Sequence, residues 1–447
     1  MNVHKVDLYP LKVVLIYISI GVLLSFFGPI GFYDYDRFPV AVYMLSFLFL
    51  FTVGYILGVI NSKFLTTNID YNLENYKLSR VLYWVKFCVV LIACVQMVTL
   101  VVGVYEGSLN LSIYKLGEAY VRGYEGYVRG TGQVSFLFFI QTITYVPYLI
   151  VLILGAYYFK DLPKYYKALV VFTYISIILL ETIGQGKQKQ LGDILIILIV
   201  VIFLRSDLLS KAIRKRIFKK ILVFAFIGMN ALITILYFRY TALGVNALNI
   251  NSKTHSLMEF NTDHLIFKIF GDDVGFPITI FTAYFSQGYY GLSLAMRQPF
   301  EWTYFMGSSY SLSVFLNRYL GVPIDFRDTY PYRVALVTGW DDTKWSTVFV
   351  WFAGDLTFIG TLFMFALVAY LYAKVWIESY RFQNPISIVI FVMLTIALLY
   401  VPANNQLLHT PGSFIAVFYF LALWGLKHKK YNFYISKIGK HELREKH

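Results

Sequence analysis

The chain has 447 residues, of which 58% are hydrophobic, 19% are aromatic and only 14% are charged. Soluble domains contain about 45–50% apolar and about 25% charged residues, so this composition excludes an ordinary soluble protein and indicates an integral membrane protein. The formal net charge of +14 would also suit a nucleic-acid-binding protein, but the placement of the cations argues against that function.

Ten apolar runs approach or exceed the length that a membrane-spanning helix needs, about 20 residues. They predict an all-α, polytopic fold with about 10 transmembrane helices, in a range of about 10–12. The sixth run is short, and the eighth is long enough to tilt. The runs lie at 13–30, 39–60, 81–104, 134–158, 167–184, 190–204, 220–238, 347–373, 386–403 and 412–426.

Most of the 39 Lys and Arg residues fall in loops that share one side of the membrane with both termini. The densest clusters lie at 205–220 and in the tail at 427–447. Cytoplasmic loops carry such an excess, so we expect both termini in the cytoplasm. The basic residues then indicate topology and contact with anionic membrane lipids, and no nucleic acid is expected as a partner.

The seventh and eighth runs are separated by one long segment, rich in Tyr, Phe, Gly and charge, which the topology places on the outer side. A loop of this length indicates a surface where something is bound or made. A semi-apolar stretch within it, 274–300, is expected at the membrane interface or packed within the loop. The predicted organisation is seven spans at 1–238, the large outer loop at 239–345, three spans at 346–426 and a basic cytoplasmic tail at 427–447.

The sequence GQGKQKQLGD predicts a tight outer turn between the fifth and sixth runs. Lys187 and the N-terminus of the following helix favour an anion site, and Gly186 allows a close approach of the backbone. Lys189 and Asp193 are spaced to meet on one helix face. The structural alternative is a solvated turn with snorkelling lysines. Positive charge on the outer side, beside the intramembrane acids Glu181 and Asp193, favours the functional interpretation.

This turn resembles the Gly-Arg or Gly-Lys element that enters a span in bacterial O-antigen and oligosaccharide repeat-unit polymerases, the Wzy type. Two other parts of the chain are similar to the same family: YFSQGYYGLSLAMR followed by FEWTY, within 284–304, and WSTVFVWFAGDLTFIG, at 345–360. The turn carries Lys187 where the family more often has Arg. A point charge then takes the place of a bidentate phosphate contact.

The resemblance implies a polysaccharide polymerase of the bacterial inner membrane, a metal-independent glycosyltransferase without a cofactor. Its substrate would be an oligosaccharide on undecaprenyl pyrophosphate, and the growing chain would be transferred to a sugar hydroxyl of the next unit. Membrane lipids and a chain-length regulator protein are the partners that the family suggests. Such a reaction needs cations at the leaving pyrophosphate, a base for the acceptor proton and aromatic faces for the sugars.

The outer segments contain candidates for each of these three roles. The candidates for catalysis are acids, those for pyrophosphate are cations, and those for sugar rings are aromatic. The catalytic candidates are Asp355, Asp272 and Asp273; the pyrophosphate candidates are Lys187, Lys189, Arg239, Arg297 and Arg333; the sugar candidates are Tyr289, Tyr290 and Trp302. No motif with metal-ligand or nucleotide-binding spacing is present, so the sequence predicts no metal site and no nucleotide cofactor.

Most of these candidates also have a structural explanation. Arg239 can anchor the end of the seventh span, and the two other arginines can pair with loop acids such as Glu301 or Asp341. The acids at 272–273 can cap a helix, and the aromatic residues can belong to the membrane belt. Asp355 is harder to explain as structural, because it falls inside an apolar run near the outer boundary.

Three other functions remain open at this point. An O-antigen ligase shares the layout and is barely separable from a polymerase by sequence. A multispan glycosyltransferase that uses lipid-phosphate sugars often has acids in its first outer loop, where this chain has Asp34 and Asp36. A polysaccharide flippase or other transporter would favour more spans, short loops and charges along a central pathway.

Overall fold

The computed structural model describes residues 5–64, 74–105, 109, 117–120, 136–206, 211–322, 326–340 and 344–426. Within these ranges the regular structure is helical apart from one small antiparallel sheet, in which β1 (Ile30–Phe32) pairs with β2 (Met258–Phe260). Six helices are long and apolar enough to cross a membrane. The all-α membrane fold is therefore confirmed, while the full number of spans, their sidedness and the location of the termini stay predictions.

Helices form at all ten predicted apolar runs. The six of spanning length are α1 (Tyr9–Phe27, preceded by η1, Lys5–Leu8), α2 (Arg37–Phe64), α3 (Glu74–Tyr105), α7 (Lys164–Ile177) continued by η7 (Ile178–Ile183), α9 (Lys211–Ala242) and α14 (Val348–Phe382). The other four runs form α5 (Phe136–Ile143) with α6 (Tyr145–Ile150) and η5 (Val151–Gly155), α8 (Lys189–Ser206), α15 (Pro385–Leu399) and the helix Pro411–Leu426.

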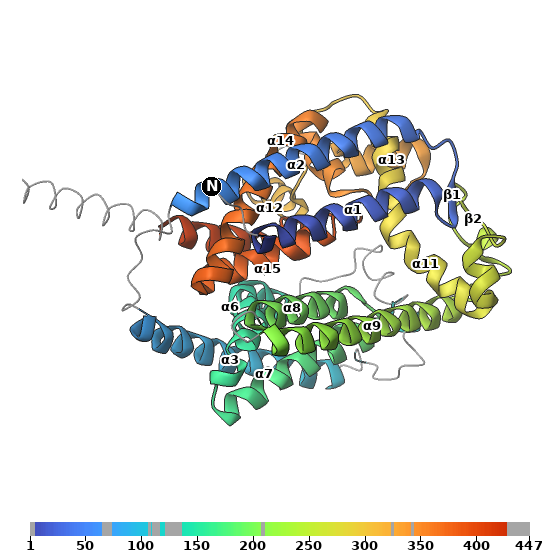
Figure 1. Ribbon diagram of the computed structural model, residues 1–447. Coiled ribbons are helices and arrows are strands. Elements are labelled where there is room, and N and C mark those ends of the chain that lie inside the picture. The colour runs from blue at the N-terminus through green and yellow to red at the C-terminus, as the bar shows by residue number, and fades with distance from the viewer. Residues whose placement is uncertain are drawn as a thin grey trace, which may run out of the picture.

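The helices are arranged in two groups (Figure 1). One group contains α1, α2, α14 and α15, and the other contains α3, α7, α8 and α9. Among the contacts that join them, α15 packs on α8 and η5, and α11 (Leu265–Met296) packs on both α1 and α9. The shorter elements are η6 (Phe159–Asp161), α10 (Ile250–Lys253), α12 (Tyr310–Leu320), η8 (Phe326–Asp328) and α13 (Tyr330–Thr338).

The α2–α14 pair is the most extensive helix–helix contact, and it is built on small residues. Gly54 and Gly58 lie one turn apart in the sequence GYILG, so they share one face of α2. A Cβ atom at either position would overlap a carbonyl oxygen of α14, that of Ala366 or that of Tyr370. Close backbone packing of this kind drives helix association in lipid, where neighbouring lipid tails remove the hydrophobic driving force between helices.

Replacing Gly58 with Leu is expected to separate α2 from α14 and to lower the melting temperature of the detergent-purified protein. Overpacking costs about 1–3 kcal/mol in a closely packed interior. The matched control is Gly425→Leu, because a Cβ at Gly425 meets no atom of the described residues within 4 Å. Equal melting temperatures for the two variants, measured by thermal unfolding with size-exclusion detection, would contradict this packing.

The segment expected to be a long loop contains a helix that belongs to the bundle. Residues 265–296 form α11, which is kinked at Gly271, where φ is 70°, and contains Pro277. Its second half is buried against α1, so the interpretation of 274–300 as a stretch at the interface or within the loop was wrong. Small residues explain the difference, because a Cβ at Gly288 would overlap the carbonyl oxygen of Pro402.

Candidate functional site

The turn between η7 and α8 lies beside the end of α15, deep within the bundle. Tyr400, the residue after α15, donates from its hydroxyl to the carbonyl of Lys189 at 3.4 Å. The Tyr17 hydroxyl donates to the carbonyl of Leu399. Tyr17 lies ten residues before Phe27, the end of α1, which is about 15 Å at the helical rise. Both chain reversals therefore lie near the middle of α1, where non-helical backbone requires surrounding protein or a lined cavity.

Lys187 is the most loosely held cation of this turn. Its backbone N–H donates to the Glu181 carbonyl at 3.0 Å, and Gly186 before it adopts a φ of 65°. Its ammonium lies 3.9 Å from a Glu181 carboxylate oxygen, and the two side chains are 52% and 26% exposed. An ion pair this long and this exposed contributes little stability, so Lys187 can exchange Glu181 for another anion.

Lys189 is held much more tightly than Lys187. Its ammonium lies 2.5 Å from Asp193 Oδ2, which confirms the expected pairing along one helix face. The same ammonium lies 5.5 Å from the centre of the Tyr400 ring, a distance typical of a cation–π contact. Because its charge is already balanced by Asp193, Lys189 is a poorer candidate for pyrophosphate than Lys187.

A cavity of about 110 Å³ borders the Lys189–Asp193 pair. Its polar lining comes from α8, from Tyr145 and Tyr148 of α6, from Gln406 in the segment after α15, and from Ser413 of the helix Pro411–Leu426. Its other walls are apolar, so a few polar groups stand in a largely hydrophobic space, as is usual for ligand sites. Two buried lining atoms, Gln190 Oε1 and Asp193 Oδ1, have no hydrogen-bond partner among the residues that the structure describes.

Two π-helical segments flank this region. Leu152 of η5 lines the cavity, and Glu181 of η7 pairs with Lys187. A π-helical turn widens the helix, and such segments occur frequently at functional sites. Their position on both sides of the turn therefore supports a functional role for this part of the bundle.

Arg239 lies at the end of α9, where it is surrounded by tyrosines. Its guanidinium carbon is 3.1 Å from the centre of the Tyr120 ring and 5.9 Å from that of Tyr240. A guanidinium held by ring faces keeps donors for an anion.

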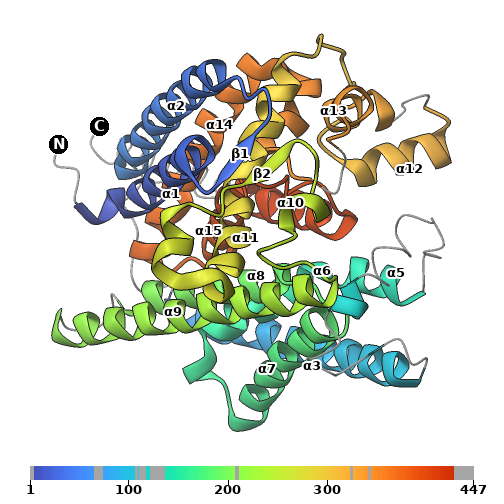
Figure 2. The same ribbon diagram turned by 90° about the vertical axis from the view of Figure 1, so that its right-hand side faces the viewer.

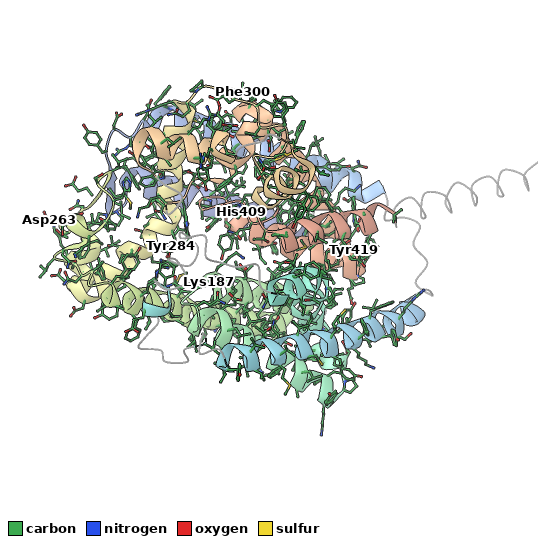
Figure 3. The ribbon with its side chains drawn as sticks, turned by 180° about the vertical axis from the view of Figure 1, so that it is seen from behind. Lys187, Asp263, Tyr284, Phe300, His409 and Tyr419 are labelled. Carbon is green, nitrogen blue, oxygen red and sulfur yellow. The ribbon has the colours of Figure 1, made fainter. Side chains whose placement is uncertain are left out.

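The same central region contains His409, in the segment after α15. Figure 3 shows Lys187, Tyr284 and His409 in the middle of the molecule, whereas Asp263 and Phe300 lie at its edges. The His409 ring contacts the edge of the Trp351 ring, with centroids 5.0 Å apart. Burial lowers the pKa of His409 from its ordinary value of 6.5, so the imidazole is neutral near pH 7.

The two other arginines predicted for pyrophosphate are occupied by loop groups. Arg297 donates to Asp34 Oδ2 at 2.5 Å and to the Asp34 carbonyl at 2.7 Å. Arg333 lies 3.0 Å from Glu301 and donates to the Pro299 carbonyl at 2.8 Å. These contacts match the structural alternative of pairing with loop acids, and they tie the segments before α2 and before α12 to the bundle.

Asp355 was predicted as a catalytic acid, and in the structure it has a clear structural role, so its catalytic role stays an untested prediction. The side chain is 6% exposed. It accepts hydrogen bonds from the Thr303 hydroxyl, from Gly307 N at 3.0 Å and from Ser308 N at 2.8 Å. A carboxylate engaged by three donors and closed to solvent is a poorer candidate for contact with a substrate than an exposed one. Its role is to hold the backbone before α12.

Asp272 and Asp273 are exposed and follow the kink at Gly271. They therefore stand in the first turn of the second half of α11, where acidic side chains interact favourably with the helix dipole. This is close to the capping role considered for them, and their catalytic role stays a prediction.

Two of the three aromatic candidates are core residues. Tyr289 and Tyr290 are 0% and 1% exposed, so neither ring has a face open to a sugar. Tyr290 stacks on Phe32 with ring centroids 4.9 Å apart and donates to the Tyr33 carbonyl at 2.8 Å. Their burial favours the structural alternative, and the sugar-binding role of these two residues stays an untested prediction. Trp302, by contrast, is 48% exposed.

Sequence reasoning did not select Tyr145, Tyr400 or Gln406, which the structure places around the turn. A signal for Gln406 was present. The ninth apolar run is followed by PANNQLLHTPG, an unusual concentration of amide side chains between two apolar runs. Such polar groups near membrane depth are expected to line a site.

Comparison of the chain with protein-family models, with curated proteins and with solved structures finds no match. The class that the fold defines is an all-α membrane protein with a polar site recessed among its helices. Any assignment of activity therefore rests on the site itself and on the resemblance of the sequence segments described above.

Proposed function

We propose that this protein is a membrane glycosyltransferase that joins oligosaccharide repeat units carried on undecaprenyl pyrophosphate, at the outer face of the bacterial inner membrane. The observation that carries the proposal is the recessed turn at Lys187, with a loosely paired cation at the start of α8 beside a polar cavity. A lipid pyrophosphate places two negative groups at the end of an apolar chain. A cation surrounded by spanning helices is suited to meet such a group.

In the proposed reaction, the bond between the sugar C1 of the growing chain and the phosphate oxygen breaks. A bond forms between that C1 and a hydroxyl oxygen of the next lipid-linked unit. Lys187 stabilises the negative charge that develops on the leaving pyrophosphate, and Arg239 is the second candidate cation. The acceptor proton passes to a carboxylate. Because Asp355 is engaged, Glu181 beside Lys187 is the better candidate for this base.

The alternative of a multispan glycosyltransferase that uses lipid-phosphate sugars has less support from the geometry than the polymerase. It depended on Asp34 and Asp36 in the first outer segment, and Asp34 forms an ion pair with Arg297. Membrane lipids and a chain-length regulator remain the proposed partners. A ligase and a flippase are separated from a polymerase by the phenotype of a deletion strain.

Deletion of the gene is expected to leave surface glycans that carry a single repeat unit, and a plasmid copy should restore the ladder of long chains on a gel. Single units form because transfer to the acceptor core does not require polymerisation. Glycan that accumulates on the lipid carrier, unattached to the core, would identify a ligase instead. Repeat units trapped on the cytoplasmic face would identify a flippase, and an unchanged ladder would refute the proposal.

A further inference from the structure

The segment between α11 and α12 contains two consecutive residues with unfavourable backbone conformations. Tyr304 has a φ of 52° and Phe305 a φ of 64°, in the left-handed region that favours glycine. Each such residue costs about 1–2 kcal/mol, so the conformation persists only where the surroundings enforce it. Adjacent aromatic residues held this way indicate that their direction matters for function.

Buried hydrogen bonds enforce this conformation. Thr303 N donates to the Gly354 carbonyl at 3.0 Å, and the carboxylate of Asp355 accepts from three groups of the same segment. The Ser308 carbonyl accepts from Asn405 Nδ2 at 2.5 Å. Asp355 thus fixes the backbone of the segment between α11 and α12 from its buried side. This role explains why an acidic residue occurs within an apolar run.

The enforced conformation directs aromatic side chains outwards. Trp302, Tyr304 and Phe305 are 48%, 58% and 60% exposed. The Trp302 ring lies 4.5 Å from the Tyr304 ring and 5.7 Å from the Phe305 ring, measured between centroids. We call these three residues the aromatic cluster. A compact exposed cluster of large apolar side chains marks a surface that something else covers.

The neighbouring span indicates what covers the cluster. Along α14, Ile359, Phe363 and Leu367 are strongly exposed and repeat every four residues, so they form one lipid-facing stripe. The aromatic cluster is bonded to this helix at Gly354, five residues before Ile359. It therefore stands beside the same element, just before the non-helical residue Thr357, after which the exposed stripe begins.

The helix that follows the cluster has the same character. In α12, Phe315, Tyr319 and Leu320 are exposed, whereas Ser313 is buried. Figure 2, which looks onto the side of the molecule with β1 and β2, shows α12 at the edge of the bundle. A short helix with an apolar outer face at the edge of a membrane bundle fits the plane of the interface.

We propose that the aromatic cluster is an interfacial anchor that inserts into the boundary between lipid headgroups and hydrocarbon. Trp and Tyr concentrate at this depth, because their rings are apolar and their polar atoms reach the headgroups. Phe305 enters the hydrocarbon edge. The partner of Trp302 is then the bilayer rather than a sugar ring, and Asp355 serves the anchor by fixing its backbone.

The test is fluorescence quenching of the full-length protein in phosphatidylcholine vesicles. Two lipids are compared, one with bromine near the headgroup end of its acyl chains and one with bromine near the chain terminus. The signal of Trp302 is the difference between the wild type and Trp302→Phe, which keeps an aromatic ring. We expect the shallow bromine to quench this difference signal about twofold more than the deep bromine. Equal quenching, or no quenching, would overturn the proposal.

A second variant separates insertion from folding. The double variant Tyr304→Asn, Phe305→Asn places asparagine at both positions. Asparagine tolerates the left-handed region, so the backbone conformation should be retained while the two rings are removed. In this variant, quenching of Trp302 by lipid is expected to fall, and quenching by aqueous iodide to rise. Protection of Trp302 by added free oligosaccharide, with no response to brominated lipid, would show that a glycan covers the cluster instead.

Discussion

Replacement of Lys187 with Ala is expected to remove the long-chain glycans of a complemented deletion strain and to leave mainly single units. Lys187 is the only one of the two turn lysines whose carboxylate partner is distant, at 3.9 Å against 2.5 Å for Lys189. Loss of one preorganised cation at a leaving group costs about 10²–10³-fold in rate. The readout is the length distribution of glycans on a gel, at matched levels of membrane-inserted protein.

Two variants complete this experiment. Lys187→Arg keeps the charge and adds a bidentate donor, so it should retain the ladder. Lys219→Ala removes an exposed cation at the start of α9 and should have no effect. A ladder of full length from Lys187→Ala would remove the main support for the proposed site.

Asp355→Ala is expected to destabilise the protein by about 3–5 kcal/mol, since it leaves two backbone N–H groups and one hydroxyl without an acceptor. The affected donors belong to Thr303, Gly307 and Ser308, all around a carboxylate that is 6% exposed. The aromatic cluster should lose its fixed direction at the same time. Thermal unfolding of the purified protein measures the first effect, and brominated-lipid quenching measures the second.

The control is Asp273→Ala, which removes an exposed acid from the kinked part of α11 and should leave the melting temperature nearly unchanged. Asp355→Asn should have an intermediate melting temperature. Its amide oxygen still accepts a hydrogen bond, but its NH2 group faces another hydrogen-bond donor. If Asp355→Ala were as stable as the wild type and yet failed to polymerise glycan, Asp355 would be catalytic and its structural role would be refuted.

The helical membrane fold was predictable because apolar runs of spanning length have few other structures available in a bilayer. The path of residues 274–300 was not predictable, because Pro277 and two glycines indicate a break in the helix when the sequence is considered locally. In the fold, glycines instead permit the closest approach, as Gly288 does against Pro402. The GYILG sequence of α2 was a readable packing signal for the same reason, and it predicts the contact with α14.

The candidate site was predictable in part. Positive charge in a loop predicted on the outer side of the membrane pointed to Lys187. Helical spacing pointed to the Lys189–Asp193 pair, which the structure contains. Spacing along the chain carries no information about distant partners. The pairing of Arg297 with Asp34 and the donors around Asp355 depend on segments brought together by the fold. For that reason the sequence overestimated how many charges are free to bind a substrate.

The length of α15 has a consequence for the electrical properties of the membrane around this protein. Its 15 residues extend about 22 Å, less than the about 30 Å of the hydrocarbon core. The segment from Tyr400 to His409 follows α15, and its residues Gln406 and Leu407 line the cavity. Water that enters this recess shortens the insulating layer, so the membrane potential falls over a smaller distance there. Charges at the bottom of the recess would sense part of that potential, and so would any anion bound to them.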